Sequence, residues 1–339
     1  MQLVNRRAFV AGVRVVVTIA LLCALLARVD TERLAQVLAN VSPVPFVFAL
    51  AALALAITLN AVRWHFVLGA VNASPGTSRL IRITFVGQFF NQVLPTGIGG
   101  DVVRAWRCYS LGIRLGTAIR SLLLDRASGY AIIVLLYAAG LPMLFHTVAD
   151  DLQRQVFIAV FILSVAGLAA LFFVDYLPVS FRRLKLLASF AIISGEARSL
   201  VANWWRITMI LGLSLLGAGL NILTYERIGS SIGAHISLVE WLLIVPPVTL
   251  VQLIPLSIAG WGIREVALVA VMTAFGASSE VALATSLLFG AVQILVGLPG
   301  GLIWLTRQDV PRDVSVAKYP PVWPSMPALR DETVVTPQA

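Results

Sequence analysis

The sequence has few of the residues that metalloproteins and many enzymes depend on. Of its 339 residues, two are cysteines, three are histidines, and 12% are charged. Cys23 is predicted within a helix and Cys108 near a membrane edge, so neither a disulfide nor a CxxC pair is available. The histidines form no HExxH pair, and Walker and dinucleotide-binding glycine patterns are missing. We therefore predict no metal, no cofactor and no direct use of ATP.

Apolar residues, by contrast, are abundant and make up 59% of the chain. A helix that crosses a bilayer needs about 20 of them in succession. We predict an all-α fold, a polytopic membrane bundle of about eight transmembrane helices in one domain, residues 1–306. The candidate runs are Val15–Ala27, Leu34–Val62, Ala127–Ala149, Gln155–Val174, Ile207–Tyr225, Trp241–Ile263, Val266–Ser279 and Val281–Thr306. Residues 307–339 form a proline-rich tail that we predict to be disordered.

The basic residues predict the orientation of the bundle. With the N-terminus inside and every run crossing, 21 of the 25 lysines and arginines fall on the cytoplasmic side. We predict a multi-pass protein of the inner (plasma) membrane with both termini cytoplasmic. A cleaved secretory signal is the alternative interpretation of the first run, and it would leave the later segments unchanged. The same bias explains the net charge of +9 without nucleic acid as a partner.

Two segments are broken by proline and glycine next to apolar sequence. The first contains Pro95, three glycines, Asp101 and Arg104, and the second follows 160 residues later. The matched positions are Pro95 with Pro255, Gly100 with Gly260, and Arg104 with Arg264. Irregular backbone is tolerated at membrane depth only where it is packed in protein or lines a wet cavity, and a duplicated break points to a transporter's substrate site. The repeats are parallel if every run crosses, and inverted repeats become possible if a short segment is re-entrant.

Several ordered motifs resemble the flippase-like membrane domain of the lysylphosphatidylglycerol synthase family, over roughly residues 10 to 306. They are Asn91-x-x-Leu94-Pro95-x-Gly97-x-Gly99-Gly100-Asp101-x-x-Arg104, Asp125-Arg126, Pro255 to Glu265, and Gly297-Leu298-Pro299-Gly300-Gly301-Leu302-Ile303-Trp304. In that family a soluble domain attaches lysine from aminoacyl-tRNA to phosphatidylglycerol, and the membrane part moves the product to the outer leaflet. This sequence stops soon after its last predicted helix. The resemblance therefore implies lipid binding or translocation by a stand-alone member that is not an enzyme.

The two motifs predict a binding site for a lipid with a phosphate headgroup. Arginine's planar fork suits phosphate, so Arg104 and Arg264 would hold it with help from helix N-terminal amides. The alternative is that both arginines only enforce topology at the cytoplasmic boundary. Asp101 would cap the restarted helix or contact the substrate. The full predicted set is Asn91, Pro95, Gly97, Gly99, Gly100, Asp101, Arg104, Asp125, Arg126, Pro255, Gly260, Arg264 and Glu265.

The identity of the lipid stays open at this point. Aminoacylated phosphatidylglycerol, another phospholipid and a polyprenyl-phosphate-linked glycan all carry a phosphate and acyl tails. Two other functions also stay open. Asp30 and Glu32 on the first outer loop form an acidic pair like that of membrane glycosyltransferases with polyprenyl-linked donors. Alternatively, the protein would be a non-transporting scaffold for a partner synthase or glycosyltransferase, with its tail as the docking site.

Overall fold

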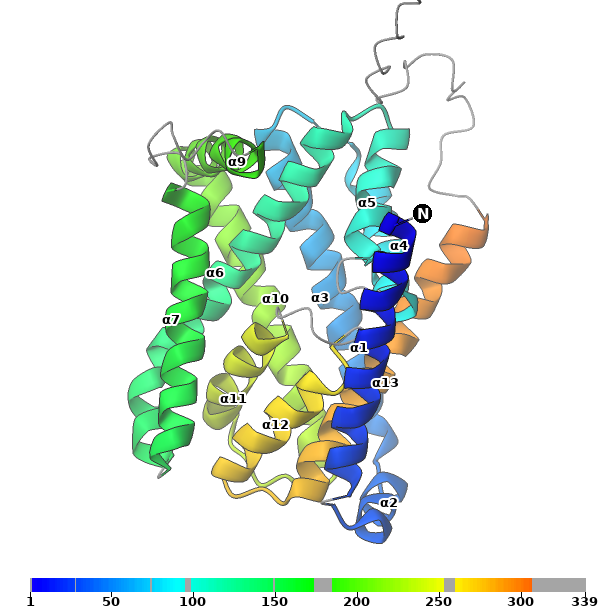
Figure 1. Cartoon of the computed structure of the whole chain (residues 1–339), viewed down its shortest axis with the longest axis vertical. Helices are drawn as coiled ribbons and strands as arrows, with labels where there is room; N and C mark the ends of the chain where they lie inside the picture. The colour runs from blue at the N-terminus through cyan, green and yellow to red at the C-terminus, as the bar shows by residue number, and fades with distance from the viewer. Residues whose placement is uncertain are drawn as a thin grey trace, which may run out of the picture.

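The computed structural model describes residues 2–27, 29–73, 75–94, 99–148, 150–173, 185–252 and 260–306. Within these ranges the chain forms twelve helices and no strand, which confirms the predicted all-α class (Figure 1). The helices are α1 (Gln2–Leu26), α2 (Thr31–Ala39), α3 (Pro43–Ala70), α4 (Thr77–Val93), α5 (Gly99–Ser110), α6 (Leu115–Thr147), α7 (Asp151–Phe173), α9 (Lys185–Ala202), α10 (Trp204–Ser231), α11 (Leu238–Val251), α12 (Ile263–Ala274) and α13 (Ser279–Thr306).

Five helices in the described ranges are long and apolar enough to cross a membrane, namely α3, α6, α7, α10 and α13. The apolar part of α1, Val15–Leu26, and the whole of α11 are shorter. The predicted run Leu34–Val62 is divided, because α2 ends at Ala39 and Pro43 opens α3. Proline is well suited to the first turn of a helix, where its missing amide has no partner to lose. The predicted tail, from residue 307, lies outside the described residues.

Two hydrophobic clusters mark the opposite ends of the bundle. One gathers the end of α3, the start of α4, the end of α5 and the starts of α6 and α10 around α9. The other joins α2 to the end of α10 and the start of α13 through Leu34, Ile232 and Leu283. Figure 1 shows α9 across the first end and α2 at the second. These ends give each helix a direction.

The helices α4 and α5 form an antiparallel hairpin that enters from the α9 end. Asn91 of α4 meets Gly100 of α5, and Gly87, one turn earlier in α4, lies against Arg104, one turn later in α5. Residues that approach in this reversed order belong to two helices running in opposite directions. The predicted break is therefore a helical re-entry, with α4 ending at Val93 and α5 beginning at Gly99.

The helices α11 and α12 form a second hairpin, which enters from the α2 end. With 14 and 12 residues they are roughly 21 and 18 Å long, short of the roughly 30 Å hydrocarbon core. The start of α11 follows α10 and the end of α12 precedes α13, both at the α2 end. The prediction that Trp241–Ile263 and Val266–Ser279 each cross as single helices was therefore wrong, because continuous apolarity does not reveal a re-entry.

The chain thus contains an inverted repeat, α3–α6 and α10–α13. The contacts of the first unit have counterparts in the second: α4 packs on α13 as α11 packs on α6, while α3 and α10 pack on each other. The two units point in opposite directions, since α3 begins at the α2 end and α10 begins beside α9 (Figure 1). Inverted repeats of this kind place transporter binding sites where the two units meet.

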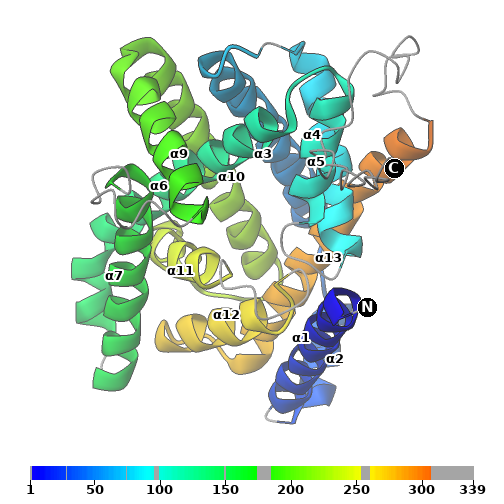
Figure 2. The ribbon, with the colours of Figure 1, turned by 45° about the horizontal axis from the view of Figure 1, so that its top comes forward.

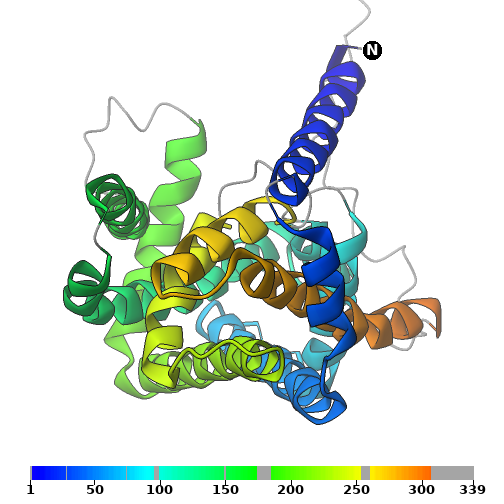
Figure 3. The same cartoon turned by 90° about the horizontal axis from the view of Figure 1, so that it is seen from below.

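Two further helices lie at the edges of the bundle. Between α7 and α10, the helix α9 lies over α6 and α10 (Figure 2). An ion pair of 2.8 Å between Arg120 and Glu196 joins α6 to α9. Trp204 and Trp205, 73% and 54% exposed, open α10 where interfacial tryptophans are expected. Figure 3 shows α1 at the periphery, where it contacts α12.

Candidate functional site

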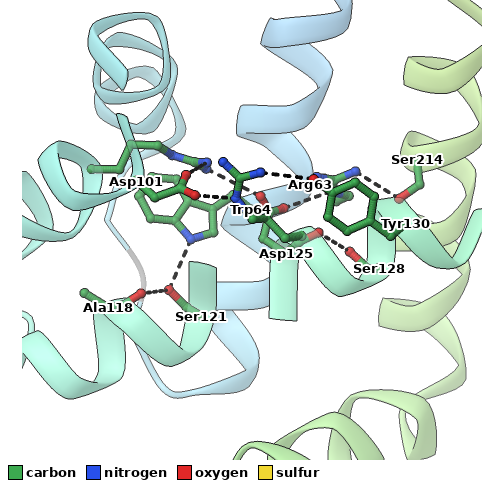
Figure 4. Close-up of polar contacts among 11 residues, drawn as sticks. Arg63, Trp64, Asp101, Ala118, Ser121, Asp125, Ser128, Tyr130 and Ser214 are labelled. Carbon is green, nitrogen blue, oxygen red and sulfur yellow. Dashed lines mark hydrogen bonds and ion pairs between the residues drawn. The ribbon is translucent and has the colours of Figure 1, made fainter. Parts of the chain in front are cut away.

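Five charged residues from three helices meet beside the first hairpin, and we call them the charged cluster: Arg63, Asp101, Arg104, Asp125 and Arg126. Asp125 accepts a hydrogen bond from Arg63 Nε at 2.8 Å and pairs with Arg104 Nη2 at 3.5 Å (Figure 4). Asp101 pairs with Arg104 Nη1 at 3.3 Å and also with Arg126 Nε. The two motif segments that the sequence placed 21 residues apart, Arg104 and Asp125, are therefore in contact.

The charged cluster lies inside the bundle and not at its boundary. Asp125 stands ten residues after Leu115, the first residue of α6, which is roughly 15 Å along the helix axis. Arg63 lies within α3, which continues to Ala70. The predicted runs ended at Val62 and began at Ala127, so these limits of the two helices were wrong. Each of these charges has a partner on another helix, and paired charges can stay within membrane helices.

Aromatic and hydroxyl side chains hold the arginines of the cluster in place. The guanidinium of Arg104 lies over the Trp64 ring at 4.1 Å, a cation–π contact. The Trp64 indole donates to Ser121 Oγ at 3.1 Å, and Figure 4 shows this bond below the cluster. On the other side, Arg63 Nη1 donates to Ser214 Oγ at 3.2 Å, which ties α3 to α10.

The charged cluster lines a cavity of about 270 Å³, which we call the polar cavity. Helices α10 and α11 of the second repeat contribute Ser214, Asn221 and Thr249, so the polar cavity lies between the two repeats. Three buried atoms of its lining have no hydrogen-bond partner among the described residues: Thr84 Oγ1, Arg104 Nε and Asn221 Oδ1. Because buried polar atoms in proteins nearly all have a partner, a ligand or water that reached these atoms would complete their hydrogen bonding.

The charges that line the polar cavity do not cancel. Three arginines face two aspartates, which leaves one positive charge in excess. All four carboxylate oxygens are already engaged: those of Asp125 by Arg63 and Arg104, and those of Asp101 by Arg104 and Arg126. An uncompensated charge inside a membrane protein is costly, so an anion in this cavity would be stabilised.

Asn91, and not Asp101, accepts a hydrogen bond from an amide at the start of α5. The Gly100 amide donates to Asn91 Oδ1 at 2.8 Å across the hairpin. Asp101 lies in the first turn of α5, and its carboxylate turns to the arginines. The prediction that Asp101 caps the helix was wrong, because ion pairs to two arginines replace a bond to a neutral amide. Pro95 and Gly97 lie outside the described residues.

The second motif forms a closed cluster of its own. Arg264 donates to Glu265 Oε1 from Nη2 at 2.6 Å, to Ser286 Oγ from Nε at 3.0 Å, and to Gln293 Oε1 from Nη1 at 2.9 Å. Glu265 also accepts the Gly262 amide at 2.5 Å, which closes the first turn of α12. Both charged side chains are fully buried, and neither is among the residues that line the polar cavity.

The structure therefore separates the predicted site residues into two groups. Asn91, Gly100, Asp101, Arg104, Asp125 and Arg126 come together at the first hairpin, where Gly99 begins α5, whereas Gly260, Arg264 and Glu265 belong to the second. Pro255 lies outside the described residues. That Arg264 and Glu265 bind a headgroup stays a prediction, and a ligand would reach them only if their cluster opened.

Sequence reasoning missed Arg63, Trp64, Tyr130 and Ser214, which belong to no motif. A signal for Arg63 existed, because an aspartate at membrane depth requires a cationic partner. In the acidic pair of the first outer loop, Asp30 also has a local role, because its side chain accepts the amides of Glu32 and Arg33 as the N-cap of α2. Among the described residues there is no group of three His, Cys, Asp or Glu side chains that could hold a metal.

Comparison with known proteins agrees with the resemblance of the motifs. No curated protein matches the sequence. Residues 10–301 match the family described as the lysylphosphatidylglycerol synthase TM region. This match covers most of the 339 residues and includes both hairpins. The chain is thus a multi-pass membrane protein that belongs to the lysylphosphatidylglycerol synthase TM-region family, a domain associated with lipid handling.

Proposed function

We propose that the protein binds a phosphate-bearing lipid in the polar cavity and moves it between the leaflets, without catalysing a reaction. The observation that carries this proposal is the charged cluster inside the bundle, with its excess positive charge between two inverted repeats. Ionisable residues at membrane depth mark substrate pathways more often than structural sites. A helix hairpin that ends inside the bundle provides backbone amides and close approach at the same place.

The phosphate would replace interactions that the charged cluster leaves incomplete. Arg104 Nε has no partner among the described residues, and it would donate a charge-assisted hydrogen bond to a phosphate oxygen. Such a bond is worth about 1.5–3 kcal/mol. Rocking one repeat against the other would then expose the polar cavity to each side in turn, as in other inverted-repeat transporters.

Lipid movement between leaflets tests the proposal. The purified protein is reconstituted into vesicles with acyl-labelled phosphatidylglycerol, and label in the outer leaflet is quenched by a membrane-impermeant reagent. Arg104→Ala should slow the movement by roughly one to two orders of magnitude, and Arg104→Lys should restore part of it. Arg79→Ala is the control, because Arg79 is exposed and lies outside the cavity lining. Equal rates of lipid movement for Arg104→Ala and Arg79→Ala would show that the proposed site is wrong.

Two other functions can be tested with further variants, in cells and in the same vesicles. A glycosyltransferase that uses Asp30 and Glu32 should lose its cellular phenotype when both are replaced by amides, although Asn at position 30 still caps α2. A scaffold that docks a partner synthase through its tail should lose function on truncation at Arg307. Normal lipid movement in both variants supports the transporter.

We also propose that the protein lies in the plasma membrane with both termini cytoplasmic. In Figure 1, α1 begins and α13 ends in the half of the molecule nearer α9. Arg79, Arg114 and Arg120 belong to this half, whereas Arg154 and Arg227 belong to the α2 half. The excess of basic residues therefore predicts that the α9 end faces the cytoplasm. A periplasm-specific reporter fused after Ala339 should be inactive, and its activity would reverse the orientation.

A further inference from the structure

The polar cavity adjoins an apolar groove on the side of the bundle, with which it shares lining residues. This groove, of about 400 Å³, lies between α6, α7 and α11, and Arg126 and Tyr130 line both it and the polar cavity. Apart from those two and Ser164, its walls are aliphatic or glycine, and Leu163 is 70% exposed. A second apolar groove of about 580 Å³ continues beyond Val160 and Val251, which line both grooves.

Arg126 and Tyr130 stand where the polar and apolar parts of this site meet. Arg126 Nη1 donates to the Tyr130 hydroxyl at 3.2 Å, while Arg126 Nε pairs with Asp101. The side chain of Arg126 is 31% exposed, compared with 9% for Arg63 and 10% for Arg104. The two residues therefore place a charged and a hydroxyl group where the polar cavity meets the apolar groove. A phospholipid has the same arrangement, with a polar headgroup next to an acyl chain.

The charges of the polar cavity also restrict the headgroup. Both carboxylates are fully engaged by arginines, so no carboxylate oxygen remains for an ammonium group. The excess charge is positive, and the buried guanidinium atom without a partner, Arg104 Nε, is a donor. A cationic headgroup would bring a second uncompensated positive charge into a site that already has one.

We infer that the ligand is a phospholipid whose headgroup carries a net negative charge. Its phosphate lies in the polar cavity against Arg104 and Arg126, and one acyl chain lies in the groove between α6, α7 and α11. A lipid with a cationic, aminoacylated headgroup is excluded by the charge of the cavity. This inference rests on the proposed function for the site, but it concerns binding and so can be tested apart from movement between leaflets.

Competition among lipids with identical acyl chains tests the charge selection. Purified protein in mild detergent is mixed with dioleoyl phosphatidylglycerol, phosphatidylcholine and lysyl-phosphatidylglycerol, and bound lipid is counted by native mass spectrometry. We expect phosphatidylglycerol to be preferred over phosphatidylcholine by about tenfold, because the choline ammonium leaves the excess charge of the cavity uncompensated, with the cationic lipid bound least. Equal occupancy, or preference for the cationic lipid, overturns the inference.

Arg126 variants show whether the charge of the cluster sets this preference. Arg126→Gln makes the charges of the polar cavity cancel, so the preference for phosphatidylglycerol over phosphatidylcholine should fall to near one. Arg126→Lys keeps the charge and should keep most of the preference. Asp101 retains Arg104 as a partner in both variants, so the fold is expected to survive. A preference that is the same in both variants overturns the role of the charge.

The acyl-chain groove is tested with a matched pair of glycines. Gly167 of α7 lines the groove and Gly212 of α10 does not, yet a Cβ at either would meet no atom within 4 Å. Gly167→Leu fills the groove and should lower phosphatidylglycerol occupancy several-fold, with the ratio to phosphatidylcholine unchanged. Gly212→Leu should bind like the natural protein. If the two variants bind alike, the acyl chain does not lie in this groove.

The outcomes separate the inference from the proposed function. If phosphatidylglycerol is preferred but no lipid changes leaflet, the binding inference stands and the transport proposal fails. If lipids of every headgroup charge move at the same rate and bind equally, transport stands and the charge selection fails.

Discussion

The two hairpins share their motif spacing but differ in how they treat their arginine. In α4–α5, Arg104 is shared between Asp101 and Asp125, lines the polar cavity and retains an unpartnered Nε. In α11–α12, Arg264 is neutralised by its chain neighbour Glu265 and has no exposed surface. On our proposal, the arginine at this motif position therefore belongs to a ligand site in the first repeat and to a closed structural contact in the second.

The residues that face the arginines explain this difference. Asp125 stands ten residues after the first residue of α6, and Phe289 stands ten residues after the first residue of α13. Phe289 stacks on Tyr225 at 3.8 Å, and Arg264 lies 5.6 Å from the Phe289 ring. Because α13 has Phe289 and not a carboxylate at this position, the second hairpin supplies its own counter-charge, and Glu265 does so from within α12.

The glycines of the motif show the same divergence. Gly100 is helical, and a Cβ there would overlap the carbonyl oxygen of Gly87, so glycine is needed for close approach of α4 and α5. Gly260 has φ of +80°, and a Cβ there would meet Gln252 at 3.3 Å. Identical spacing is therefore compatible with two physical requirements, helix contact in one copy and a left-handed turn in the other.

The largest expected difference between the two hairpins is the effect of replacing Arg264. Arg264→Ala leaves Glu265 buried without its partner and should lower the free energy of unfolding by about 3–5 kcal/mol. Arg126→Ala, which removes a partly exposed pair, should lower it by about 1 kcal/mol or less. Unfolding in detergent measures both. The double variant Arg264→Met with Glu265→Leu should recover most of the loss, because no charge is then left buried.

A contrary result at Arg264 would be informative. If Arg264→Ala is as stable as the natural protein but fails to bind phosphatidylglycerol, the second hairpin is a headgroup site, and the division between the two copies is wrong.

Replacing the paired glycines, Gly100 and Gly260, by alanine should have an intermediate effect on stability and should distinguish the two hairpins. Gly100→Ala must separate α4 from α5 and should cost about 1–3 kcal/mol of stability, together with lipid binding. Gly260→Ala strains a left-handed turn and should cost about 1–2 kcal/mol, with lipid binding retained. Unfolding in detergent and lipid counting by mass spectrometry test both variants. Loss of lipid binding in Gly260→Ala alone would contradict the assignment of the site to the first hairpin.

The smallest expected effect concerns the amide bond that Asn91 makes across the first hairpin. Asn91→Ala should lower stability by about 1 kcal/mol, as for other helix caps, and weaken lipid binding by moving α5. Asn203→Ala is the matched control, because Asn203 caps α10 through the Arg206 amide at 3.1 Å, away from the polar cavity. Similar stability losses with reduced lipid binding only in Asn91→Ala are expected. Equal lipid binding in the two variants would show that the position of α5 does not affect the binding site.

Sequence reasoning succeeded where the determinant is local. The apolar runs indicated membrane helices, and proline with glycine indicated the two interruptions, because both depend on neighbouring residues. It failed for the limits of α3 and α6, where Arg63 and Asp125 lie inside helices. A charge within a membrane helix is stable only if a neighbouring helix provides a partner of opposite charge. The sequence does not show which helices are neighbours.

The sequence by itself determined that this chain is a helical membrane protein with two breaks of matched spacing, because apolar transfer and backbone stiffness act within a few residues. Only the tertiary structure decided that the breaks are re-entrant hairpins entering from opposite ends. It also decided that Arg104 meets Asp125 of α6 while Arg264 stays with Glu265. Charge pairing depends on distance in space, and residues far apart in sequence reach that distance only when the helices have packed.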